Sequence, residues 1–137
     1  MPTAPVLYVE DDPNDVFFMQ RAFHKTSALP PLQVVTHGQQ ALDYVEGRGI
    51  FTDRDRYPLP CLILLDLNLP QISGFEVLRR LRAHPVWRDL PVAIVSSSDL
   101  QQDIEKAKQL GANEYLIKPR DPSQFTELLA VLKRRWL

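Results

Sequence analysis

The chain has 137 residues, and its 16 Lys and Arg against 17 Asp and Glu give a formal net charge of -1. A chain of this length buries a core without disulfides or structural metals, so we expect a single domain over residues 1–137. The charge balance provides no basic surface for DNA or RNA, and no segment approaches the roughly 18 apolar residues of a membrane span, so we expect a cytoplasmic protein that binds neither nucleic acid nor membrane.

Short apolar runs and amphipathic segments alternate along the chain. Five runs rich in Val, Ile and Leu are typical of buried strands, the last being the weakest: residues 6–9, 32–35, 62–65, 92–95 and 115–117. Cys61 opens the third run, where a free thiol is typically a small core residue of a reducing compartment. Helical spacing of apolar residues is found at Val16, Met19 and Phe23; at Phe75, Leu78 and Leu81; at Leu100, Ile104, Ala107 and Leu110; and at Phe125, Leu128, Leu132 and Trp136.

The segments between these elements carry their own signals. Asp99 is a candidate N-cap for the helix of Leu100 to Leu110, and Gly111 should end that helix. Residues 48–60 mix Arg with Asp and end in Pro-Leu-Pro, so we interpret them as a surface excursion before the third strand. Because the chain stops shortly after its last helix, we expect no output domain and output through binding.

Strand and helix alternate five times, which predicts an α/β fold: a doubly wound, five-stranded parallel sheet with five helices on its two faces. In such a sheet, ligands bind in the crevice at the carboxyl ends of the strands. We therefore expect the functional residues at that edge.

Acidic residues follow two of the predicted strands. Glu10, Asp11 and Asp12 come after the first strand and Asp66 after the third, so their carboxylates should converge at one edge of the sheet. Clustered carboxylates repel each other, and a divalent cation with oxygen ligands, such as Mg²⁺, removes that penalty. We favour metal binding for Asp11 and Asp66, whereas for Asp12 and Asn14 we favour capping of the first helix.

The run before Asp66 delivers this carboxylate to the mouth of the crevice, where it could attack phosphorus as a nucleophile. The fourth strand leads into Ser96, Ser97 and Ser98, whose hydroxyls could donate to phosphoryl oxygens, although loop and cap chemistry accounts well for Ser98. Lys118 ends the fifth strand and would be a fixed cation. It precedes proline, which favours a tight turn and is compatible with a cis bond.

In order, these residues resemble the receiver domains of two-component response regulators, and the match covers nearly the whole chain. VLYVEDD is similar to the acidic segment of that family, LILLDLNLP to its phosphoacceptor segment, PVAIVSSS to its switch strand, and EYLIKP to its lysine segment. The resemblance implies a flavodoxin-like fold with strand order 2-1-3-4-5.

The resemblance also implies a Mg²⁺ site. Asp11 and Asp66 would be direct ligands, Glu10 would act mainly through water, and Asn68 would offer its main-chain carbonyl. Gly74 matches the family's glycine, but Ser73 stands where an Asp commonly precedes it, which should alter the loop more than the chemistry.

For function, the resemblance implies that a sensor histidine kinase phosphorylates Asp66. Ser96 would then move toward the phosphoryl oxygens, Lys118 would pair with them, and Tyr115 would rotate into the vacated space, so that a surface around the fourth helix and fifth strand signals to a protein partner. Ser97 and Ser98 would flank the site. Such a domain assists only its own phosphorylation and dephosphorylation and is not an enzyme with an outside substrate.

Within the family, the excursion at residues 48–60 and the chain end resemble the small regulators paired with bacterial phytochrome kinases. Those regulators are receiver-only and often dimeric, so a phytochrome-type kinase and a homodimer are expectations here. Val131, Trp136 and Leu137 lie off or beyond the core stripe of the last helix and are candidate interface anchors. Alternatively, Trp136 covers the edge of the sheet.

Three other functions are compatible with this fold class. A phosphorylation-independent adaptor would not need the complete set of acid, hydroxyl and lysine. A flavodoxin-like electron carrier needs a phosphate-cradling loop after the first strand, where this chain has EDDPND. A phosphatase of the haloacid dehalogenase type places a second acid two residues after its nucleophile, where this chain has Asn68.

Overall fold

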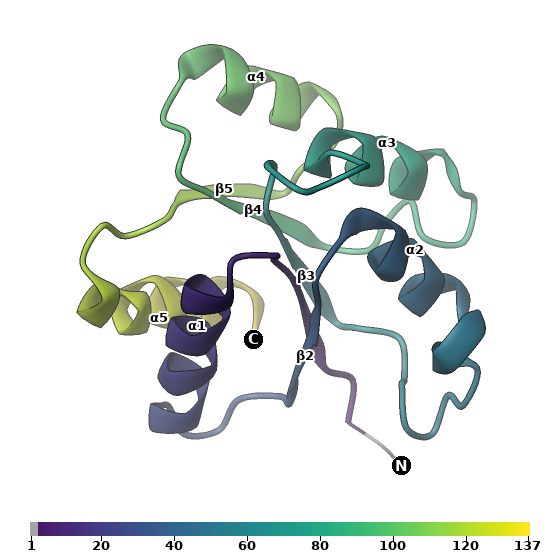
Figure 1. Cartoon of the computed structure of the whole chain (residues 1–137), viewed down its shortest axis with the longest axis horizontal. Helices are drawn as coiled ribbons and strands as arrows, with labels where there is room; N and C mark the ends of the chain where they lie inside the picture. Colours follow the sequence, from purple (N-terminus) through teal and green to yellow (C-terminus); the bar gives the residue numbers. More distant parts are fainter. Residues whose placement is uncertain (1–2) are drawn as a thin grey trace.

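Five strands form one parallel sheet in the computed structural model, which describes residues 3–137. The strands are β1 (Val6–Val9), β2 (Leu32–Val35), β3 (Leu62–Leu65), β4 (Val92–Ser96) and β5 (Glu114–Ile117). Their order across the sheet is β2-β1-β3-β4-β5, as Figure 1 shows, and every neighbouring pair is parallel. The predicted sheet is confirmed, with β4 and β5 each one residue longer than expected.

Five α-helices cover the two faces of this sheet. They are α1 (Pro13–Lys25), α2 (Gly38–Glu46), α3 (Gly74–Ala83), α4 (Gln101–Gln109) and α5 (Phe125–Trp136), with short 3-10 turns η1 (Gly49–Phe51) and η2 (Pro122–Gln124). Helices α1 and α5 lie side by side on one face, and α2, α3 and α4 lie on the other (Figure 1). None of the helices in residues 3–137 is long and apolar enough to cross a bilayer.

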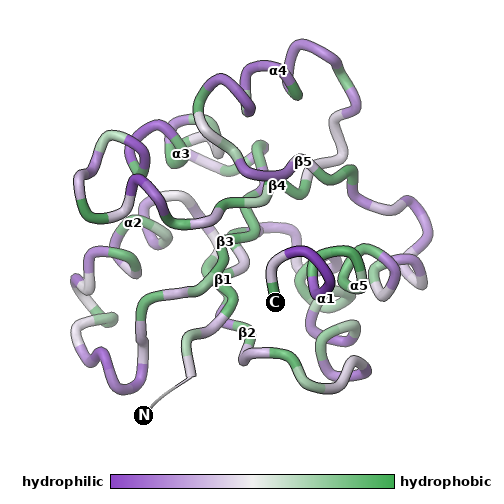
Figure 2. The backbone as a smooth tube through the Cα atoms, turned by 180° about the vertical axis from the view of Figure 1, so that it is seen from behind, coloured by the Kyte–Doolittle hydropathy of each residue, from purple (hydrophilic) through white to green (hydrophobic). Residues whose placement is uncertain are grey.

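Each central strand is apolar throughout because both faces of the sheet are covered. Alternate side chains of β1 enter two different cores: Val6 and Tyr8 pack under α1 and α5, whereas Leu7 and Val9 pack under α2 and α3. In Figure 2 the strands at the centre are mostly hydrophobic, whereas α4 is mostly hydrophilic. Cys61 is half-buried at the edge of the first of these cores rather than fully inside it.

The segment 48–60 is more than a surface excursion, which corrects the sequence interpretation. Phe51 is buried, and its ring lies 5.0 Å from that of Tyr44 and 5.1 Å from that of Tyr57. The guanidinium of Arg54 donates hydrogen bonds to the carbonyls of Tyr44 at 2.7 Å and Tyr57 at 3.0 Å. Because these bonds satisfy a carbonyl at the end of α2, Arg54 ties the segment to the helix it follows.

The helix starts follow the predicted capping with one exception. Asp12 caps α1 by accepting a hydrogen bond from the Asn14 N–H at 2.8 Å, as predicted. Asp99 does not cap α4: the N-cap is Leu100, whose side chain is 54% exposed rather than part of the core stripe. The hydroxyl of Ser98 accepts the N–H of Leu100 at 3.3 Å, but no side chain caps the first turn of α4.

Trp136 near the chain end packs against the core under α1 and α5 and is half-buried. This contact agrees with the expectation that Trp136 covers the sheet. Leu137 remains 37% exposed.

The start of α3 lies directly against the main chain that follows β3. Ser73 caps this helix by accepting the Glu76 N–H at 3.2 Å, so it fills the capping role open to an Asp at that position. The Gly74 N–H donates to the Leu67 carbonyl at 2.9 Å, and a Cβ on Gly74 would lie 2.1 Å from the Asp66 carbonyl oxygen. Only glycine permits this approach.

We expect Gly74→Ala to lower the free energy of unfolding by roughly 3 kcal/mol, because the new methyl group must displace the Asp66 main chain. Gly49→Ala is the control: Gly49 has open space around it, and its positive φ of 62° should cost only about 1 kcal/mol. Urea denaturation of both variants measures the difference. Equal losses would contradict the tight packing described for Gly74.

Candidate functional site

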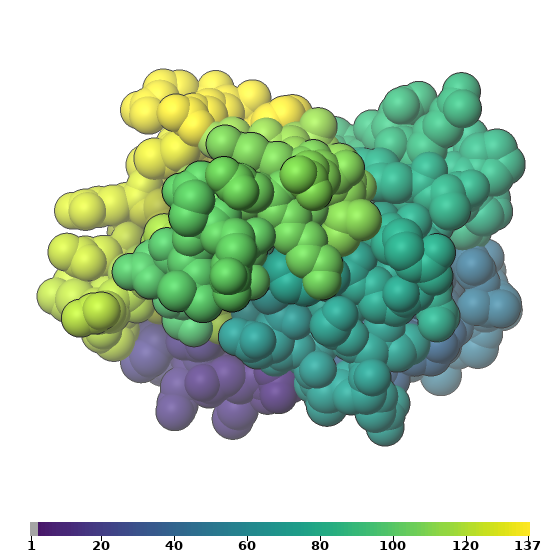
Figure 3. All heavy atoms as spheres, turned by 90° about the horizontal axis from the view of Figure 1, so that it is seen from above, coloured from purple at the N-terminus to yellow at the C-terminus, as the bar shows by residue number. Residues whose placement is uncertain are grey.

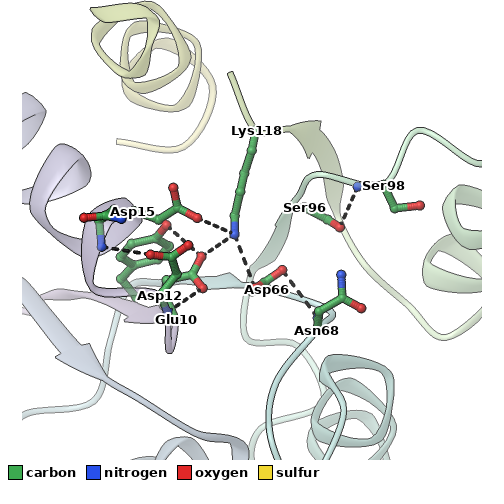
Figure 4. A network of polar contacts seen from close by, with 10 residues as sticks. Glu10, Asp12, Asp15, Asp66, Asn68, Ser96, Ser98 and Lys118 are labelled. Carbon is green, nitrogen blue, oxygen red and sulfur yellow. Dashed lines mark hydrogen bonds and ion pairs between the residues drawn. The ribbon is translucent and has the colours of Figure 1, made fainter. Parts of the chain in front are cut away.

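Polar side chains from four elements meet at the carboxyl edge of the sheet, as predicted. Glu10 follows β1, Asp66 follows β3, Ser96 ends β4 and Lys118 follows β5 (Figure 4). Glu10 and Ser96 are fully buried and Asp66 is 3% exposed. Polar groups this deeply buried need partners, which the surrounding residues supply.

The ammonium of Lys118 lies between three carboxylates. Its Nζ is 2.5 Å from Glu10 Oε1, 2.9 Å from Asp15 Oδ2 and 3.3 Å from Asp66 Oδ2. The Lys118 side chain is only 10% exposed, so water screens these contacts weakly. The backbone fixes the lysine as well, because its N–H donates to the Ser96 carbonyl at 2.8 Å, one step beyond the β4–β5 ladder. The bond before Pro119 is trans, so the turn forms without the cis bond considered above.

Burial and charge act in opposite directions on these groups. Burial raises the pKa of Glu10 to about 7, although the hydrogen bond and charge of Lys118 counteract it. Burial alone would lower the pKa of Lys118, but its hydrogen bonds to Glu10 and Asp15 and the charge of Asp66 together raise it above the ordinary lysine value. The site therefore keeps its lysine charged.

Asp15 and Tyr8 belong to this network but were not predicted from the sequence. Asp15 lies in the first turn of α1, and its closeness in sequence to the acidic residues after β1 was the available signal. Tyr8 lies two residues before Glu10 on β1, hence on the same face, and its buried hydroxyl donates to Glu10 Oε1 at 3.3 Å. Burial raises the pKa of Tyr8, so it remains a neutral donor.

Three of the predicted metal ligands lie within reach of one cation. Glu10, Asp11 and Asp66 each offer a carboxylate oxygen, and these oxygens all lie within 4.8 Å of one another. Asp11 is exposed whereas the other two are buried, so the group opens to solvent on one side. The Asn68 N–H donates to Asp66 Oδ1 at 3.4 Å, which places the Asn68 main chain beside this group. An all-oxygen donor set fits a hard divalent cation such as Mg²⁺.

The switch residues are connected through the loop after β4. The Ser96 Oγ accepts the Ser98 N–H at 3.1 Å, and the Ser98 carbonyl accepts the Tyr115 hydroxyl at 2.8 Å. Tyr115 is half-buried, packed against the core under α2, α3 and α4. Ser97 is exposed between the other two serines. The hydroxyl predicted to bind a phosphoryl group and the aromatic residue are thus linked by one residue.

Comparison with known proteins gives one matching family. The model of the response regulator receiver domain matches residues 6–130. The response regulator Rcp1 of Synechocystis sp. is 29% identical over 136 residues, which cover 99% of this chain and 90% of Rcp1.

Three solved structures also resemble this chain over 98% of its length and 94% of theirs. The response regulator RPA3017, in red light signaling of R. palustris, is 36% identical with a TM-score of 0.91. The phosphorylated cyanobacterial phytochrome response regulator RcpA is 29% identical with a TM-score of 0.89. The Mn²⁺-bound form of Rcp1 has a TM-score of 0.87 at 28% identity.

The variant Lys118→Met should be less stable than the wild type by about 3 kcal/mol near pH 8, because Glu10 and Asp66 would remain buried without a cation. The loss of stability in this variant should be smaller at about pH 5.5. A buried Glu10 whose pKa is raised binds a proton more readily when folded than when unfolded, so protonation stabilises the fold as the pH falls.

Urea denaturation in a chelating buffer at both pH values measures these losses. Lys108→Met is the control, since Lys108 is an exposed lysine of α4 and its loss should change stability by less than about 0.5 kcal/mol. Equal stability of the two variants would contradict the role given to Lys118.

Proposed function

The chain belongs to the response regulator receiver domain family, and we propose that it accepts a phosphoryl group on Asp66 from a sensor histidine kinase. Receiver domains are signalling domains and not classical enzymes, and they work together with histidine kinases. The observation that carries the proposal is the position of Asp66, which lies at the crevice between the Lys118 ammonium and the acidic pair after β1. A nucleophile with cations on its flank is what phosphoryl transfer requires.

In the proposed reaction a carboxylate oxygen of Asp66 attacks the phosphorus of a phosphohistidine. The new bond joins oxygen to phosphorus, the phosphorus–nitrogen bond breaks, and the imidazole nitrogen keeps the electron pair and takes up a proton. The two contacts to Asp66, from Lys118 Nζ to Oδ2 and from the Asn68 N–H to Oδ1, hold the carboxylate in place. Lys118 then pairs with the phosphoryl oxygens.

We propose that Asp11 and Asp66 hold a Mg²⁺ ion directly, with the main-chain carbonyl of Asn68, and that Glu10 acts mainly through water. Mg²⁺ would neutralise the charge of the transferring group when bound. The Mn²⁺-bound form of the related Rcp1 supports this proposal, as does the oxygen cluster of Glu10, Asp11 and Asp66.

Output is proposed to pass through Ser96 and Tyr115. The Ser96 hydroxyl accepts a hydrogen bond from Ser98, so its own hydrogen is available for a phosphoryl oxygen. When Ser96 turns toward that oxygen, the Ser98 carbonyl that holds the Tyr115 hydroxyl shifts with the loop, and Tyr115 moves into the space beside Ser96. The surface of α4 and β5 then changes for a protein partner.

Likeness to phytochrome-associated regulators supports a phytochrome-type kinase as the phosphoryl donor. RcpA is described as a phytochrome response regulator, and RPA3017 as acting in red light signaling.

Incubation with acetyl phosphate and Mg²⁺ should add one phosphoryl group to the wild type and none to Asp66→Asn. Asparagine keeps the shape of aspartate but lacks its nucleophilic oxygen. Intact-protein mass spectrometry with peptide mapping measures the adduct. No adduct on Asp66 from this donor or from a panel of histidine kinases would instead favour the phosphorylation-independent adaptor.

Asp11→Asn should weaken Mg²⁺ binding by more than about tenfold and slow phosphorylation, because it removes a direct ligand. Asp12→Asn is the matched control: it removes the neighbouring charge, but asparagine caps a helix as well as aspartate does. Calorimetric titration of Mg²⁺ into both variants distinguishes the two acids. Equal weakening in both would indicate a general charge effect and no direct ligand at Asp11.

Ser96→Ala should still become phosphorylated on Asp66 but should lose the accompanying change around Tyr115, because no hydroxyl links the phosphoryl group to the loop. Amide hydrogen exchange of α4 and β5, with and without acetyl phosphate, measures that change. Ser97→Ala, at an exposed position, should behave as the wild type. A normal response of Ser96→Ala would refute the proposed switch.

A further inference from the structure

The ammonium of Lys118 has no hydrogen-bond donor to spare. An ammonium carries three N–H donors and no acceptor. The acceptors around it are also three: Glu10 Oε1 at 2.5 Å, Asp15 Oδ2 at 2.9 Å and Asp66 Oδ2 at 3.3 Å. The donor on Asp66 can pass to a phosphoryl group attached there. A second bond from Lys118 to that group must be taken from Glu10 or from Asp15.

The three carboxylates lie on two sides of the ammonium. In Figure 4 Glu10 and Asp15 approach Nζ of Lys118 from one side, and Asp66 approaches it from the other. Ser96 also lies on that second side. The contacts on the first side are the two shorter ones, and the contact with Asp66 is the longest. Glu10 and Asp15 therefore attract the ammonium away from the side on which a phosphoryl group on Asp66 would lie.

Asp15 can release the ammonium at a lower cost than Glu10. Glu10 is fully buried, and Lys118 is the one cation in contact with it among residues 3–137. The Asp15 side chain is 22% exposed, so water can solvate its carboxylate when the ammonium moves. Asp15 also lies in the first turn of α1, where the helix dipole stabilises a negative charge.

The bond between Lys118 and Asp15 joins two parts of the chain that are neighbours at the surface. In Figure 3 the purple surface of the N-terminal part adjoins the yellow-green surface of the segment near residue 120, which follows β5. The bond lies at the rim of the site, and the proposed phosphoryl transfer makes no use of it.

We propose that Asp15 is a positioning residue that competes with a phosphoryl group for the ammonium of Lys118 and thereby lowers the affinity of the site for that group. This inference rests on the proposed function, in which Lys118 pairs with the phosphoryl oxygens.

Charge fixes the direction of the effect. The Asp15 carboxylate attracts the ammonium and repels an anion bound at Asp66, so its removal favours that anion on both counts. Asparagine at position 15 would keep an acceptor oxygen for Lys118 without the negative charge. If Asp15 served only to hold Lys118 in place, its loss would have the opposite effect and weaken the binding of the anion.

The test is calorimetric titration of beryllofluoride, an anionic phosphoryl mimic, at saturating Mg²⁺. Asp15→Asn should bind it roughly fivefold more tightly than the wild type. Asp12→Asn is the matched control: it removes one charge from the same segment, but Asp12 is the N-cap of α1 and lies outside the three carboxylates that contact Lys118. Its affinity should stay within about twofold of the wild-type value.

A separate titration of Mg²⁺ distinguishes an effect on the anion from an effect on the metal. Asp15→Asn should bind Mg²⁺ no more tightly than the wild type, because the loss of a carboxylate does not strengthen the attraction of a cation. Tighter binding of beryllofluoride in this variant then comes from the anion.

Unchanged or weaker binding of beryllofluoride by Asp15→Asn, with a wild type that binds it, would overturn the inference and leave the proposed function standing. Equal tightening in Asp12→Asn would also overturn it, because the effect would then belong to the net charge of the segment. Tighter binding of Mg²⁺ by Asp15→Asn would do the same, since the metal would then explain the gain. A wild type that binds no beryllofluoride and takes up no phosphoryl group on Asp66 contradicts the proposed function, and the inference falls with it.

Discussion

The rest of the site depends on the contact of one ammonium group, that of Lys118, with three carboxylates. Glu10 and Asp66 are almost removed from water, and each would be costly to bury as an isolated charge. Lys118 compensates for both, and Asp15 completes its coordination from α1. Because the four residues come from three segments that are distant in the sequence, their mutual attraction is available only once β1, β3 and β5 have found their places in the sheet. The proposed phosphoryl chemistry thus uses charges that the fold itself already has to neutralise.

The sheet fixes the relative positions of these strands because its central strands are short and apolar on both faces. Such strands have little freedom to slip, since a shift by one residue would move Glu10 or Asp66 into one of the two cores. The glycine at the start of α3 adds a second restraint, because Gly74 packs against the Asp66 main chain at a distance that no side chain permits. The Asp66 main chain is consequently held from the strand before it and from the helix after it.

The sequence allowed the strands and the meeting of Asp66 with Lys118 to be predicted, because periodicity and position at strand ends are local patterns with a fixed spatial meaning in a parallel sheet. The order of the strands followed only from the family resemblance. Asp15 and Tyr8 were missed for a different reason: whether a side chain on a correctly predicted helix or strand reaches the site depends on how that element packs. Leu100 was assigned to the apolar stripe because helical spacing does not say where a helix starts, but Leu100 is the N-cap of α4 and its side chain is exposed.

The two sides of the site differ in how closely they are packed. Around Asp66, the buried strands and the Gly74 contact hold the main chain closely, so the proposed phosphoryl group would not be accommodated by displacement of β1 or β3. The loop from Ser96 to α4 has only polar bonds and a weakly buried helix to hold it. In the proposed reaction, a phosphoryl group on Asp66 would therefore act mainly on this loop, and the change at the surface would depend on how strongly the loop is held. Natural variation in the few bonds of this loop would change the response of a receiver domain without touching its chemistry.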